Sequence, residues 1–283
     1  MDNKRKVELS IVAAKAKKHA LNGIFCAQSG HPGGSLSIMD VLVTLFFDEM
    51  NIDPKSPNMP NRDRFVLSKG HCAPGLYAVL AERGFFAPEE LGTLRRIDSF
   101  LQGHPDMKSV PGVDMSTGSL GQGVSAANGM ALAAKLDGAP YRVYVATGDG
   151  ELEEGQVWEA AMFAPHYKLD NLTLFVDSNG LQIDGEVAKV MNPGPIADKY
   201  RAFGWNVIEI DGNDYIEISG AIAKAKSVKG VPTAVICKTV KGNGISYMEN
   251  NAGWHGKAPN KDEFEKAIAE LNAEIARLEK ELN

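Results

Sequence analysis

Apolar residues along this chain fall into short runs that are separated by longer amphipathic stretches. Five of the runs are rich in β-branched and aromatic residues, which is typical of strands buried on both faces. They cover residues 64–68, 141–148, 172–178, 205–212 and 233–240. Helical periodicity is clearest over residues 6–27, 37–49, 122–136, 154–166 and 214–228. This alternation predicts an α/β fold, with a parallel sheet covered by helices on both faces.

The C-terminal part of the chain has a different pattern. Residues 241–260 are rich in Gly and Asn and predict a long ordered loop. Beyond them, apolar residues alternate at spacings of four and three, the seam of a heptad helix: Phe264, Ile268, Leu271, Ile275, Leu278 and Leu282. We expect one domain over residues 1–260 and an amphipathic helix over residues 261–283. The seam either closes the core of its own domain or docks onto another chain.

Composition narrows the class of protein. Hydrophobic residues make up 44% of the chain and charged residues 23%, which favours a folded domain over disorder. The net charge of −6 argues against nucleic-acid binding. Cys26, Cys72 and Cys237 are widely spaced and form no metal-ligand pattern, which favours reduced thiols. With neither a signal-peptide pattern nor a run long enough for a membrane helix, we expect a cytoplasmic protein that does not bind membranes.

Polar residues follow two of the predicted strands. Asp149 stands between Gly148 and Gly150 at the end of one run, and Asn179 follows the next run thirty residues later. That separation fits one strand–helix–strand unit, so both side chains should project from the same carboxyl edge of the sheet. A carboxylate and an amide oxygen suit Mg²⁺, with Ca²⁺ or Mn²⁺ as alternatives, and the ion would bridge the protein to a diphosphate. A P-loop and a dinucleotide-binding glycine motif are both missing from the sequence.

Histidines are concentrated in turns. Four of the six lie in segments rich in Gly and Pro: His31, His71, His104 and His255. Histidine gains or loses a proton near neutral pH, which suits carbonyl chemistry. The pattern alone does not bring the four together in space. His19 and His166, on or near predicted helices, are interpreted as structural.

Five separated motifs together resemble one family. One is the Gly-Asp-Gly turn with its distant Asn179. The others are SGHPGGSLSIMD (29–40), RDRFVLSKGHCAPGLYAVL (62–80), GHPDMKSVPGVDMSTGSLGQG (103–123) and WHGKAP (254–259). In this order they resemble the N-terminal half of transketolase over about residues 1–260. The resemblance implies the thiamine diphosphate-binding fold of a PP domain, with thiamine diphosphate as cofactor. It also implies transfer of a two-carbon ketol unit from a ketose phosphate to an aldose phosphate.

The resemblance assigns roles at the cofactor. Asp149 and Asn179 would bind the metal through their side chains, and Leu181 through its carbonyl. Gly148 and Gly150 would lie against the diphosphate. The aminopyrimidine side of the cofactor would meet the backbone of three further residues: Gly118, Ser119 and Leu120.

Four histidines would form the catalytic set. His71 and His255 would face the diphosphate of the cofactor and the substrate. His31 and His255 would handle protons on the substrate oxygen. His104 would form a hydrogen bond to the terminal hydroxyl of the donor sugar.

The acidic residues of the GDGELEEG turn receive different interpretations. Glu154 matches a family glutamate that pairs across the dimer between cofactor sites, and Glu159 a nearby acidic position. Glu151 and Glu153 have no such match. We interpret these two as first-turn acids that the helix dipole favours.

Single-chain members of that family continue into a pyrimidine-binding domain, which carries the glutamate that activates the cofactor. We therefore expect this chain to be the N-terminal subunit of a split transketolase. Its partner would be a C-terminal subunit in an α2β2 assembly, and its substrates would be sugar phosphates. The alternatives are a non-catalytic thiamine diphosphate-binding subunit, the α subunit of a 2-oxoacid dehydrogenase, and a deoxyxylulose-phosphate synthase fragment. The individual sugars stay open.

Overall fold

The computed structural model describes residues 1–282. Five parallel strands form the central sheet in the order β1-β2-β3-β7-β6. They are β1 (Arg64–Leu67), β2 (Val143–Gly148), β3 (Leu172–Ser178), β6 (Asn206–Asp211) and β7 (Thr233–Lys238). Each predicted run therefore contains a strand, and the predicted parallel α/β fold is confirmed. A short antiparallel hairpin follows β3, formed by β4 (Leu181–Gln182) and β5 (Gly185–Glu186).

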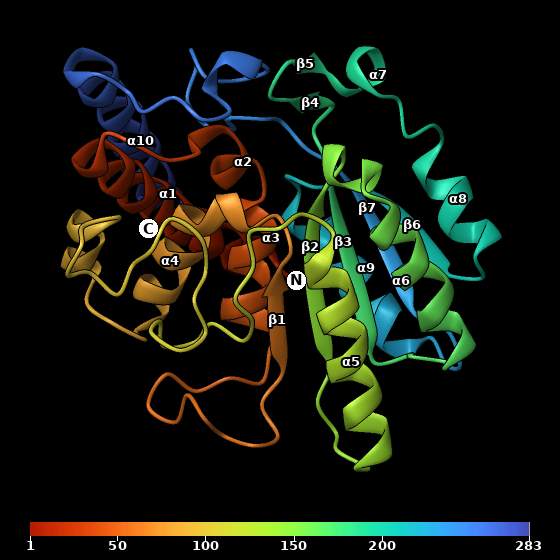
Figure 1. Cartoon of the computed structure of the whole chain (residues 1–283). Helices are drawn as coiled ribbons and strands as arrows, with labels where there is room; N and C mark the ends of the chain where they lie inside the picture. The colour runs from red at the N-terminus through yellow and green to blue at the C-terminus, as the bar shows by residue number, and fades with distance from the viewer. Residues whose placement is uncertain (283) are drawn as a thin grey trace.

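Helices cover both faces of the sheet (Figure 1). On one face lie α1 (Asn3–Ala27), α3 (Met39–Thr44), α4 (Ala73–Arg83) and α9 (Tyr215–Ser227). On the other lie α5 (Gln122–Leu136), α6 (Gly155–His166) and α8 (Ile196–Ala202). Successive strand side chains point to opposite faces: in β2, Tyr144 joins the first core and Val145 the second. Strands β1, β2, β3 and β7 are largely buried on both faces, as continuous apolar runs require. The edge strand β6 is only partly buried, and its Glu209 is exposed.

Some helices depart from the predicted pattern. The stretch predicted as one helix over residues 37–49 is divided into α3 and a π-helical turn, Leu45–Glu49, and α2 (Pro32–Ser37) precedes it. Helix α4 was not predicted, because its first residues, Ala-Pro-Gly, look like a turn. Pro74 instead occupies the first turn of the helix, where its missing N–H costs nothing. Two short helices, α7 (Val187–Val190) and α8, were not predicted by the periodicity either.

Helix α10 (Lys261–Leu282) lies along α1 (Figure 1). Leu271 packs with Leu21 of α1, and Leu278 packs with Val7 and Ile11. The rings of Phe25 and Phe264 stack at 4.3 Å. This packing agrees with the first interpretation of the seam, a helix that closes the core of its own domain. The division at residue 260 stays a prediction, and Asn283 lies outside the described residues.

A buried ion pair joins four segments at the carboxyl edge of the sheet. Lys69, just after β1, pairs with Asp177 near the end of β3. Both side chains are at most 2% exposed. Lys69 Nζ also donates to the Gly34 carbonyl of α2, at 3.1 Å. The Asp177 carboxylate accepts from the hydroxyls of Ser37 in α2 and Thr239 after β7.

The charges of this pair are fixed by their contacts. Burial by itself would raise the pKa of Asp177, but the ammonium of Lys69 and the hydroxyl donors hold it below its usual value. Burial works against the charged form of Lys69 as well, and Asp177 raises its pKa nonetheless. Both shifts favour the ionised pair.

Membrane-spanning candidates are not found in the described part of the chain: every helix within residues 1–282 is either too short or too polar to cross a bilayer.

We predict that Lys69→Met lowers the free energy of unfolding by about 3 kcal/mol, because it leaves the carboxylate of Asp177 buried without a counter-charge. Urea unfolding measures this change. The matched control is Lys189→Met, since that lysine pairs with Glu186 at the surface and should change stability by less than about 0.5 kcal/mol. Equal effects of the two substitutions would contradict the prediction.

Candidate functional site

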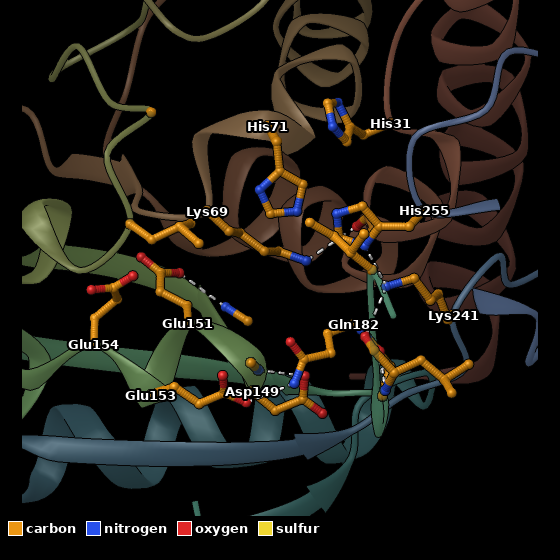
Figure 2. Close-up of a pocket in the computed structure, with 18 residues that line it drawn as sticks. His31, Lys69, His71, Asp149, Glu151, Glu153, Glu154, Gln182, Lys241 and His255 are labelled. Atoms are coloured by element: carbon orange, nitrogen blue, oxygen red, sulfur yellow. Dashed lines mark hydrogen bonds between the residues drawn. The ribbon is translucent and has the colours of Figure 1, made fainter. Parts of the chain in front are cut away.

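A cavity of about 400 Å³ opens at the carboxyl ends of β1, β2 and β3. Parallel α/β sheets bind ligands at this edge. All of the predicted site residues except His104 and Ser119 line the cavity. Figure 2 shows the histidines along one side and the acidic residues along the other.

Three histidines meet in the cavity although they are far apart in the sequence. His31 precedes α2, His71 lies in the 3-10 helix Gly70–Cys72, and His255 follows the 3-10 helix Ala252–Trp254. Their ring centroids are 5.1 Å (His31–His71), 5.5 Å (His31–His255) and 5.1 Å (His71–His255) apart. The turn motifs therefore converge, which the sequence pattern could not show.

These histidines are neutral at pH 7. Burial, with help from neighbouring positive groups, lowers the pKa of His31 and of His71 to about 4. Burial and the ammonium of Lys241 lower the pKa of His255 to about 3. Lys241 Nζ lies 3.1 Å from His255 Nδ1. Because an ammonium can only donate, Nδ1 accepts, and the ring proton of neutral His255 is on Nε2.

His104 lies beside the cavity, not in its lining. Its ring packs against Gly118, where an added Cβ would approach the ring to 3.2 Å. The Tyr77 hydroxyl donates to the His104 carbonyl at 2.8 Å. Ser119 is exposed on the same turn. The predicted role of each stays a prediction.

The predicted metal ligands lie together at the edge. Gly148 is paired in register with Asp177 on the neighbouring strand, so Asp149 and Asn179 leave adjacent strands at the same level, as expected. The Asp149 carboxylate accepts from the N–H groups of Gly150 at 2.9 Å and Gly180 at 2.6 Å. It is 4% exposed, and among the described residues no lysine, arginine or histidine forms an ion pair with it. Burial raises the pKa of Asp149 to about 6.

Four further hydrogen bonds orient Asn179 and Leu181. Asn179 Nδ2 donates to Ser37 Oγ and to Asp177, both at 3.3 Å, and Asn179 Oδ1 accepts from the Leu181 N–H at 3.1 Å. The Leu181 carbonyl accepts from Lys241 Nζ at 2.8 Å. Residues 1–282 contain no metal-like group of three or more His, Cys, Asp or Glu side chains. A cation here would depend on Asp149, amide and carbonyl oxygens, and oxygens of its ligand. This donor set suits a hard ion such as Mg²⁺.

Two lysines of the cavity were not predicted. Lys69 and Lys241 both line it, and both are buried. Burial lowers the pKa of Lys241, because a desolvated site disfavours its charged form. Each lysine directly follows a predicted strand, in SKG and VKG respectively. That position was the available signal, because the carboxyl ends of parallel strands meet at one edge.

Glu151 is an acid in the first turn of a short 3-10 helix, as predicted, but it has a larger structural role than that interpretation gave it. Its side chain is 3% exposed and accepts from three donors: Ser68 Oγ at 2.5 Å, the Gly121 N–H at 2.9 Å and the Gly148 N–H at 3.1 Å. Glu153 also lines the cavity, and accepts from Gln182 Nε2 at 2.7 Å. Both residues lie in the short 3-10 helix Gly150–Glu153. No local pattern indicated the burial of Glu151, since two of its three partners, Ser68 and Gly121, come from distant segments.

The remaining acids and histidines lie at the periphery. Glu154 lines the open side of the cavity, and Glu159 is exposed on α6. Their interface roles stay predictions. His19 pairs with Glu82 at 2.9 Å, and His166 ends α6. Both histidines lie away from the cavity lining.

The cavity lining combines two buried lysines, Lys69 and Lys241, with four acidic residues: Asp149, Glu151, Glu153 and Glu154. The charge of Lys69 is paired with Asp177, which leaves Lys241 as the lysine of the lining without an ion-pair partner among residues 1–282. The Asp149 carboxylate has no cationic partner there either, and it could hold a cation that faces an anionic ligand. Neutral histidines beside them can exchange protons with a bound carbonyl or hydroxyl compound.

Comparison with known proteins gives the family. A model of "Transketolase, thiamine diphosphate binding domain" matches residues 10–276. The chain is 46% identical over 274 residues to a 6-deoxy-6-sulfo-D-fructose transketolase subunit of Clostridium sp. (strain MSTE9), covering 97% of this chain and 100% of that one. It is 42% identical to an apulose-4-phosphate transketolase subunit of Phocaeicola vulgatus, covering 97% of this chain and 98% of that one.

Longer relatives match over part of their length. The chain is 44% identical to human transketolase, covering 97% of this chain and 44% of that protein. The transketolase structure from Campylobacter jejuni superposes with a TM-score of 0.88 at 32% identity, over 97% of this chain and 46% of that one. The chain thus spans less than half the length of these proteins. The resemblance found in the sequence is confirmed, and the chain belongs to the transketolase family as a thiamine diphosphate binding domain.

Proposed function

We propose that this chain is the N-terminal subunit of a two-chain transketolase. One observation carries the proposal: the chain matches two transketolase subunits over 98–100% of their length, but human transketolase over 44%. The missing remainder would come from a partner subunit with the pyrimidine-binding domain. An α2β2 assembly in the cytoplasm, with active sites at subunit interfaces, completes the proposal.

The cavity fits thiamine diphosphate with a divalent ion. Lys241 and the turn at Gly150 would hold the diphosphate. Asp149, Asn179 and the Leu181 carbonyl would hold Mg²⁺, with Ca²⁺ or Mn²⁺ as substitutes. The buried, unpaired carboxylate of Asp149 is the observation that supports a cation. When bound, thiamine diphosphate supplies the carbanion chemistry that breaks and forms the carbon–carbon bond of a ketose.

The chain's own groups would orient the sugar and move its protons. His31 Nδ1 is buried and has no hydrogen-bond partner among residues 1–282, so it is available to a sugar oxygen. His255 would donate from Nε2, because Lys241 occupies Nδ1. His71 would be the third histidine of the cavity lining to face the ligand. His104, whose ring packs against Gly118, would reach the terminal hydroxyl of the donor. Neutral imidazoles suit such transfers, since each can accept and donate a proton.

The proposed reaction moves a two-carbon ketol unit from a ketose phosphate to an aldose phosphate. Relatives are named for different ketoses, 6-deoxy-6-sulfo-D-fructose and apulose 4-phosphate, so the family resemblance alone selects no single donor. The first of these sugars carries a sulfo group in place of a phosphate, so a phosphate on the donor is part of the proposal. The histidines in the cavity disfavour both a purely cofactor-binding role and membership of a 2-oxoacid dehydrogenase. Neither those alternatives nor a deoxyxylulose-phosphate synthase fragment is favoured by any specific contact.

We predict that the purified chain, supplied with thiamine diphosphate and Mg²⁺, is inactive in ketol transfer by itself. Adding the partner subunit should restore turnover, because the pyrimidine side of the cofactor site would then be complete. A coupled assay with a ketose phosphate donor measures both states. Robust transfer by the chain alone would sink the two-chain proposal.

We also predict that Asp149→Asn weakens Mg²⁺-dependent cofactor binding by at least about tenfold, because an anionic metal ligand is lost. Titration calorimetry with and without Mg²⁺ gives this value. In the unaltered chain, Mg²⁺ affinity should also fall as the pH drops through about 6, because the ion must displace the proton of Asp149.

The matched control is Asp198→Asn, which makes the same chemical change on the exposed surface of α8. It should leave both the affinity and its pH dependence unchanged. An Asp149→Asn protein that binds cofactor with Mg²⁺ as tightly as this control would rule out the proposed metal site.

A further inference from the structure

Glu151 is tied to three separate segments of the cavity wall. Its Oε1 accepts from Ser68 Oγ, at the end of β1, and from the Gly121 N–H, at the start of α5. Its Oε2 accepts from the Gly148 N–H, at the end of β2. These contacts measure 2.5, 2.9 and 3.1 Å respectively. One side chain therefore joins two turns that lie on opposite sides of the proposed cofactor: residues 118–121 and 148–150.

The carboxylate is not free to act on a ligand. Both of its oxygens are occupied by protein donors, and the residue is 3% exposed although it belongs to the cavity wall. Helix α5 begins at Gly121 without a side-chain cap of its own. The anionic oxygen of Glu151 supplies that cap from another segment and is favoured there by the helix dipole. The contact set is that of a structural link between turns.

From these contacts we infer that Glu151 is a positioning residue that fixes the spacing between the turn 118–121 and the turn 148–150. The inference rests on the proposed function, in which the first turn meets the aminopyrimidine side of thiamine diphosphate and the second meets its diphosphate. A ligand that spans both turns depends on this spacing. A ligand that touches the second turn alone does not.

Only a carboxylate of this length satisfies all three donors. A glutamine at position 151 has one oxygen and one NH₂ group. If the amide oxygen accepts from the Gly121 N–H, the NH₂ group faces the Gly148 N–H, which is also a donor. In the opposite orientation the NH₂ group faces the Gly121 N–H, and that donor loses its acceptor. Ser68 can rotate its hydroxyl to accept, but a backbone N–H cannot. Glu151→Gln therefore releases one turn while it keeps the volume of the side chain.

The test compares two ligands on the full chain and on its complex with the partner subunit, both with Mg²⁺. Thiamine diphosphate spans the two turns, and inorganic diphosphate reaches only the turn 148–150. For Glu151→Gln, the Kd of thiamine diphosphate should rise about tenfold, the effect of losing one hydrogen bond to a charged acceptor. The Kd of inorganic diphosphate should change less than about twofold, because the turn 148–150 is also held by the sheet, where the Asp149 N–H donates to the Asp177 carbonyl at 3.2 Å.

Two further variants make the test decisive. Ser68→Ala removes one donor and keeps both backbone contacts, so the Kd of thiamine diphosphate should rise about threefold with no change for diphosphate. If Glu151→Gln does not fold, this variant decides the outcome by the same comparison. Glu209→Gln, on the exposed side of β6, is the matched control and should alter neither Kd.

The outcomes separate this inference from the function on which it rests. A higher Kd for thiamine diphosphate with an unchanged Kd for inorganic diphosphate supports the positioning role. An equal rise in both Kd values shows a general loss of structure and overturns the positioning role. Unchanged Kd values for both ligands overturn it as well. If the unaltered complex binds neither ligand, the proposed function fails and the inference fails with it.

Discussion

The arrangement of this site depends on the buried ion pair between Lys69 and Asp177. Two opposite charges with almost no solvent contact are held by hydroxyls and a carbonyl from other segments. Such a pair is costly to assemble and tolerates little misplacement. It therefore fixes how the ends of β1, β3 and β7 lie relative to α2. The pair contributes to the positions of these segments more than to the free energy of unfolding, since hydrophobic residues of similar volume could stabilise a core equally well.

Site residues follow the members of this network at short intervals. His71 comes two residues after Lys69, Asn179 two after Asp177, and Lys241 two after Thr239. His31 lies three residues before Gly34. These four side chains are thus close in sequence to residues that are themselves buried and hydrogen-bonded. Glu151 extends the same principle to the far side of the cavity, where it holds the turns that the ion pair does not reach.

Sequence patterns predicted those features of the fold and of the site that depend on neighbouring residues in the chain. Buried strands are continuous apolar runs, so all five were located, and the spacing of Asp149 and Asn179 placed both at one sheet edge. Lys69, Lys241 and Glu151 were missed because a charged residue gives no local sign that it is buried. Lys69 is paired with Asp177, which is 108 residues away. Glu151 accepts from Ser68 and Gly121, which are 83 and 30 residues away. Helix α4 was missed for a different reason: Pro74 and Gly75 mark turns in isolation, yet here Pro74 lies in the first turn of the helix and Gly75 packs closely against Ser35.

The central claim is that this chain forms one half of a cofactor site and that another subunit completes it. The most direct measurement is the Kd of thiamine diphosphate with Mg²⁺, determined by calorimetry for the chain alone and for the chain mixed with its partner. The account predicts at least about tenfold tighter binding in the mixture, equivalent to about 1.4 kcal/mol from the pyrimidine-side contacts. Equal affinity in the two titrations would contradict it, because the site would then be complete within this chain.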